Sequence, residues 1–139
     1  MRYPLDELLD KRSIVQLKIE RVPEENDRER LKKEYLDYSQ AIDEYVNEGV
    51  CTREQAEMWF RELYTANGAV WSLEERIRRG QIGHLSLEEI GKTAIKIREA
   101  NGIRVGIKSK IVESTGLGYR DIKINHASQD ALVNYRSNP

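Results

Sequence analysis

Apolar residues recur at intervals of three and four residues through four long segments of this chain of 139 residues. This spacing places side chains on one face of an α-helix, so each segment predicts a helix with one buried face. The expected helices run from Pro4 to Val22, from Pro23 or Asn26 to about Gly49, from Thr52 to Arg79, and from Ser86 to about Ser114. Because short turns join them, we expect an all-α fold, an antiparallel four-helix bundle with long helices.

Local signals support these boundaries. Two pairs of residues have the spacing of a capping box, which marks the start of a helix: Thr52 with Gln55, and Ser86 with Glu89. The pair Asn67-Gly68 disfavours a helix interior, but the apolar pattern continues in phase across it, so we expect one unbroken helix there.

The periodic pattern stops at Gly116. Residues 1–116 are therefore predicted to form the helical bundle domain. Residues 117–139 are predicted to form a C-terminal arm, partly extended or disordered, that could dock on another subunit.

Composition excludes several classes of protein. A formal net charge of −1 argues against a nucleic-acid binder, and no window holds the roughly eighteen apolar residues of a membrane span. The single cysteine, Cys51, and a start without the apolar run of a signal peptide predict a cytoplasmic protein. His84 and His126 lie in loop-like segments, so neither a metal site nor a cofactor is predicted.

Charge is unevenly distributed along the chain. Residues 20–48 hold ten acidic and five basic residues, whereas residues 92–123 hold eight basic and three acidic ones. Two readings remain open: helices that attract each other across a bundle or dimer, or an anion site on the basic half.

Polar residues interrupt the apolar stripes of the last two helices. Asn101, Arg104 and Lys108 continue the apolar stripe of the fourth helix, which predicts that they face inward. Four residues of the third helix lie on one side at intervals of four, three and four: Asn67, Trp71, Glu74 and Arg78. Since buried charge is costly unless it is paired or used, these seven residues form the candidate ligand-binding site.

The polar set has two interpretations. In the first, its cations and amides hold a small anionic ligand such as a nucleotide or sugar phosphate, with Trp71 stacking on a ring. In the second, Glu74 pairs with Arg104 and Lys108, and the set is an internal ion network that fixes helix pairing.

Three stretches together resemble a family of uncharacterised all-helical bacterial proteins, often associated with genes for lipopolysaccharide or other surface glycans. Residues 10–20 are similar to the family's D-K-x-S/T-I-x-x-L-K-x-E helix, residues 67–78 to its N-x-x-L-W-x-x-E-D-x-I-R segment, and residues 97–108 to its I-x-x-x-N-x-x-R-x-x-I-K segment. Arg12, Val70 and Glu75 depart from these patterns. The resemblance implies the helical fold and a recurring polar set, but no activity.

The sequence therefore predicts a non-enzymatic binding or accessory protein, self-associating, with a polar pocket between the third and fourth helices for a small anionic ligand. One alternative is a purely structural or partner-binding bundle. Another is a magnesium-dependent enzyme similar to the nucleotide pyrophosphohydrolases. That reading is disfavoured because Arg78 follows Glu74-Glu75 where such enzymes place a third carboxylate. No catalytic residue is assigned.

Overall fold

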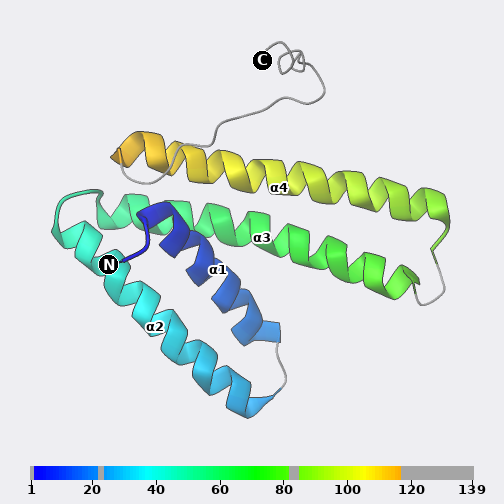
Figure 1. Cartoon of the computed structure of the whole chain (residues 1–139), viewed down its shortest axis with the longest axis horizontal. Coiled ribbons are helices and arrows are strands. Elements are labelled where there is room, and N and C mark those ends of the chain that lie inside the picture. Colours follow the sequence, from blue (N-terminus) through cyan, green and yellow to red (C-terminus); the bar gives the residue numbers. More distant parts are fainter. Residues whose placement is uncertain (1, 22–23, 82–84, 117–139) are drawn as a thin grey trace, which may run out of the picture.

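Four α-helices make up the described part of the chain in a computed structural model (Figure 1). The structure describes residues 2–21, 24–81 and 85–116. The helices are α1 (Leu5–Arg21), α2 (Glu25–Asn47), α3 (Arg53–Gln81) and α4 (Leu87–Thr115). The predicted all-α fold is confirmed; the predicted arm, residues 117–139, lies outside the described residues.

The helix ends follow the local signals. Thr52 Oγ1 accepts a hydrogen bond from the Gln55 amide, and Gln55 Oε1 accepts one from the Thr52 amide. Ser86 and Glu89 exchange the same pair of bonds, so both predicted capping boxes are present. Gly116 ends α4 with a φ of 71°, a left-handed conformation that glycine adopts without steric cost. Helix α3 runs without a break through Asn67-Gly68.

The helices form two antiparallel pairs. Helices α3 and α4 lie side by side as a long hairpin, and α1 and α2 form a shorter pair that crosses it (Figure 1). Helix α1 packs against α2, α3 and α4. Helix α2 packs against α1, makes only slight contact with α3 and does not contact α4. Helix α1, and not α2, is therefore the neighbour on which the α3–α4 hairpin packs.

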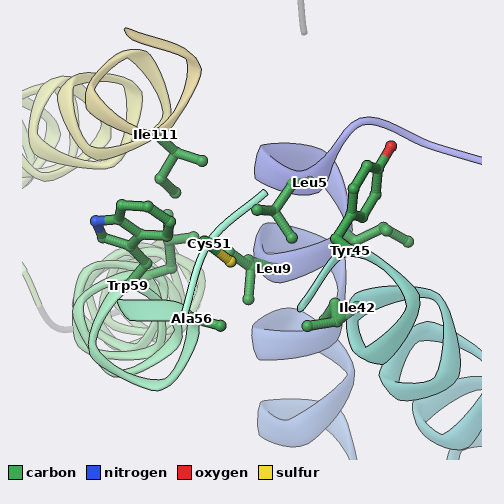
Figure 2. Close-up of a cluster of buried hydrophobic side chains, with 10 residues drawn as sticks. Leu5, Leu9, Ile42, Tyr45, Cys51, Ala56, Trp59 and Ile111 are labelled. Carbon is green, nitrogen blue, oxygen red and sulfur yellow. The ribbon is translucent and has the colours of Figure 1, made fainter. Parts of the chain in front are cut away.

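The main core lies where one end of each helix meets the others. Figure 2 shows Leu5 and Leu9 of α1 between two groups of side chains, with Ile42 and Tyr45 of α2 on one side and Trp59 of α3 and Ile111 of α4 on the other. The Tyr45 hydroxyl donates to the carbonyl oxygen of Tyr3, at 3.0 Å, which satisfies its polar end.

The far half of the α3–α4 hairpin extends beyond α1 and α2 (Figure 1). Among the described residues of α4 before Asn101, only Thr93 and Ala100 are buried. None of the described helices combines the length and apolar character that a membrane-spanning helix needs.

Candidate functional site

Arg104 of α4 points at a carboxylate of α1, Asp10. The Asp10 residue is only 2% exposed. Arg104 Nε donates to Asp10 Oδ1 at 3.0 Å, and Arg104 Nη2 donates to Asp10 Oδ2 at 2.6 Å. This two-pronged contact matches the planar fork of a guanidinium to the two oxygens of a carboxylate. A partly buried ion pair therefore joins α1 to α4.

Asn67 of α3 also hydrogen-bonds to Asp10. Its Nδ2 donates to Asp10 Oδ1 at 2.9 Å and to Ser13 Oγ at 2.8 Å. The Ser13 hydroxyl in turn donates to the carbonyl oxygen of Asp10, at 2.7 Å. Asn67 and Ser13 are both buried, so these bonds replace the water that each group loses on folding.

Lys108 lies one turn after Arg104 and pairs with the same helix. Its Nζ donates to Glu7 Oε2 at 2.9 Å and lies 3.8 Å from Asp10 Oδ2. Two cations of α4 thus face two carboxylates of α1. We call this set the α1–α3–α4 network; its members are Glu7, Asp10, Ser13, Asn67, Arg104 and Lys108.

The network sets the protonation of Asp10. Burial acts to raise the pKa of its carboxyl group, but hydrogen bonds from Arg104 and Asn67, with the charges of Arg104 and Lys108, outweigh it and leave the pKa below the usual value. The same hydrogen bond raises the pKa of Arg104. Both groups are therefore charged at neutral pH.

The pKa of Asp6, one turn before Asp10, shifts in the opposite direction. It is 5% exposed, and its Oδ1 atom has no hydrogen-bond partner among the described residues. Burial, together with the charge of Glu7, raises the pKa of the Asp6 carboxyl group. Ionised Asp6 therefore opposes folding, and its protonation as the pH falls relieves that cost.

We expect acid to destabilise the protein through Asp10. Because its pKa is lower in the folded state, its stabilising contribution is complete above the unfolded value of about 4 and is lost as the pH falls through the folded pKa. Urea unfolding at a series of pH values measures this loss. The double variant Asp10→Leu/Arg104→Met should lack this part of the pH dependence; an unchanged pH profile in that variant would assign the loss to other carboxyl groups.

A small pocket of about 240 Å³ lies beside the network, between α1, α3 and α4. Its apolar lining comes from Ile14, Leu17 and Val70, and its remaining lining consists of predicted site residues. These are Asn67, Trp71, Glu74, Asn101 and Arg104. The guanidinium of Arg21 lies 5.5 Å from the ring centre of Trp71. Five of the seven candidate residues thus line one pocket.

The remaining candidate residues lie elsewhere. Lys108 lines a different pocket, of about 180 Å³, with Asp6 and Glu7. Arg78 is exposed and does not line the pocket beside the network. Glu74 is exposed and forms no ion pair among the described residues, so its pairing with Arg104 and Lys108, as in the second interpretation, is wrong. Asp10 and Glu7 take its place.

A second buried cation, Arg12, was not predicted as a site residue. It is 6% exposed, and its guanidinium lies 4.3 Å from the ring centre of Phe60 and 5.3 Å from that of Tyr35. Arg12 Nη1 donates to Ser39 Oγ at 3.1 Å, and Nη2 lies 3.9 Å from a carboxylate oxygen of Glu57. Because its guanidinium stacks on Tyr35 of α2 and Phe60 of α3, Arg12 links α1 to both helices.

The described part of the chain offers little support for a metal site or a nucleophilic cysteine. Those residues contain no group of three His, Cys, Asp or Glu side chains placed to hold a metal ion. Cys51 is buried, and burial raises the pKa of its thiol, which disfavours the thiolate that a nucleophile needs. His84 and His126 lie outside the described residues.

Comparison with known proteins gives no relative for this chain: no family model, no curated protein and no solved structure matches it.

Proposed function

We propose that this chain is a non-enzymatic binding or accessory protein that holds a small anionic ligand in the pocket between α1, α3 and α4. The observation that carries this proposal is that Trp71, Asn101 and Arg104 line one pocket beside a fixed ion pair. Binding sites combine an apolar wall with a few polar groups held in place, and this pocket has both.

The polar groups indicate the ligand class. The bonds to Asp10 use two of the five N–H groups of Arg104, so three remain for a carboxylate or phosphate. The side chain of Asn101 makes none of the hydrogen bonds found among the described residues. Trp71 offers a flat surface for a sugar or base. A volume of about 240 Å³ suits a sugar phosphate, or one end of a nucleotide.

A specific observation favours the second candidate, a structural or partner-binding bundle. Asp10 already balances the charge of Arg104, and Glu7 that of Lys108, so neither cation requires an external anion. In this reading the network only fixes how α1 packs on the hairpin. The hydrolase alternative has no comparable support. The glycan-associated family, the cytoplasmic location and self-association remain predictions from the sequence.

Thermal unfolding in the presence of inorganic phosphate, sugar phosphates, nucleotides and nucleotide sugars separates the two candidates. A ligand at a hundred times its Kd should add about 2.7 kcal/mol to the free energy of unfolding and raise Tm. We expect Trp71→Ala and Asn101→Leu to abolish this rise. The matched control is Ser72→Ala, an exposed neighbour on α3, which should keep it. If no compound raises Tm, or if Trp71→Ala responds like the control, the pocket is not a ligand site.

A further inference from the structure

A second, larger hollow lies between α3 and α4, and none of its lining residues belongs to α1 or α2. Its volume is about 580 Å³. Its apolar surface includes Met58, Ala69, Ala100, Ile103 and Ile107. We call it the α3–α4 groove. It shares no residue with the pocket beside the network, so it is a separate site.

Side chains around the groove are unusually exposed for apolar residues. Ile103 is 61% exposed and Met58 is 43% exposed. Three charged residues also line the groove, and two of them are paired: Lys110 Nζ lies 3.0 Å from Glu62 Oε1. The third, Arg61, makes no ion pair among the described residues. The groove therefore combines an apolar floor with one unpaired cation.

We propose that residues 117–139 of the same chain occupy the α3–α4 groove. Helix α4 ends at Gly116, which has the left-handed conformation with a φ of 71°. Lys110 lies six residues before Gly116, about 9 Å along the helix, a distance that about three extended residues cover. The segment is therefore tethered within reach of one end of the groove.

The sequence of the segment complements the groove. Leu117, Tyr119, Ile122 and Ile124 supply apolar side chains within its first eight residues, and Asp121 lies among them as a partner for Arg61. From Lys110 to Ala100 the groove extends about 15 Å along α4, which about five extended residues span. Because the segment is tethered at Gly116, its effective concentration at the groove is in the millimolar range, which lets weak contacts suffice.

Hydrogen exchange in the full chain, measured by mass spectrometry, tests the proposal. Amides within residues 117–139 should exchange about tenfold or more slowly than in a free peptide of the same sequence. Ile103→Glu places a charge in the groove and should remove this protection. The matched control is Ile95→Glu, which changes an isoleucine of the same helix that is 50% exposed and does not line the groove. The control should retain the protection.

Two results would overturn the proposal. Exchange of residues 117–139 at the rate of the free peptide, in the unmodified chain, would show that the segment does not dock. Protection that survives Ile103→Glu would place the segment elsewhere. Molecular mass in solution, measured for both variants, identifies the other occupant: if Ile103→Glu alone turns a dimer into a monomer, a second copy fills the groove.

Discussion

Replacing Arg104 with methionine should lower the free energy of unfolding by about 3–5 kcal/mol, one of the two largest effects expected in this protein. Methionine retains most of the packing of the arginine stem but removes both hydrogen bonds to Asp10. The Asp10 carboxylate, 2% exposed, would then be left without its main counter-charge. Urea unfolding, followed by circular dichroism, measures the loss.

Removing the carboxylate as well should restore most of that stability. In Asp10→Leu/Arg104→Met no unpaired charge remains, and apolar replacements of a buried ion pair are often tolerated. Glu74→Gln is the control, because Glu74 is exposed and does not contact Arg104. If Glu74→Gln restored the Arg104→Met protein and Asp10→Leu did not, the network described above would be incorrect.

Leu9→Ala should cost about 2–5 kcal/mol in the free energy of unfolding. Leu9 is completely buried and lies in the core that α1 shares with the other helices (Figure 2). Truncating it leaves a cavity that surrounding side chains fill only in part. Leu36→Ala on α2 is the matched control, since Leu36 is 61% exposed. Its cost should stay within about 0.5 kcal/mol. Equal costs for both variants would contradict the central position of α1.

The helices themselves could be predicted well from the sequence, because their signals are local. Capping boxes at Thr52 and Ser86 act within one turn, and the apolar pattern through Asn67-Gly68 needs no distant partner. The pairing of the helices could not be predicted in the same way. It depends on which faces match in shape, and α1 takes the central position because it is buried on several sides.

The partners of the polar residues were missed for the same reason. Asp6, Asp10 and Ser13 lie on one face of α1 at intervals of four and three, which is the signal that could have identified them. Arg104 was predicted correctly to face inward. Its partner, Asp10, lies on α1, far away in sequence.

The net charges of the segments were also an ambiguous guide to which helices pack together. The acidic residues 20–48 lie mostly on α2, and the basic residues 92–123 begin on α4, yet α2 and α4 do not contact each other in one chain. Three cations of α4 pair instead with other helices: Arg104 with Asp10 and Lys108 with Glu7 of α1, and Lys110 with Glu62 of α3. Net charge over a segment therefore did not identify the contact, because individual side chains on matching faces determine it.

Titration of the Asp10 carboxyl carbon by NMR tests most directly whether this residue is held by Arg104. We predict a pKa below the ordinary aspartate value in the unmodified protein. In Arg104→Met only Asn67 and Lys108 still oppose the effect of burial, so the pKa of Asp10 should rise. An Asp10 that titrates at the ordinary value in both proteins would contradict the ion pair on which the packing of α1 against the hairpin depends.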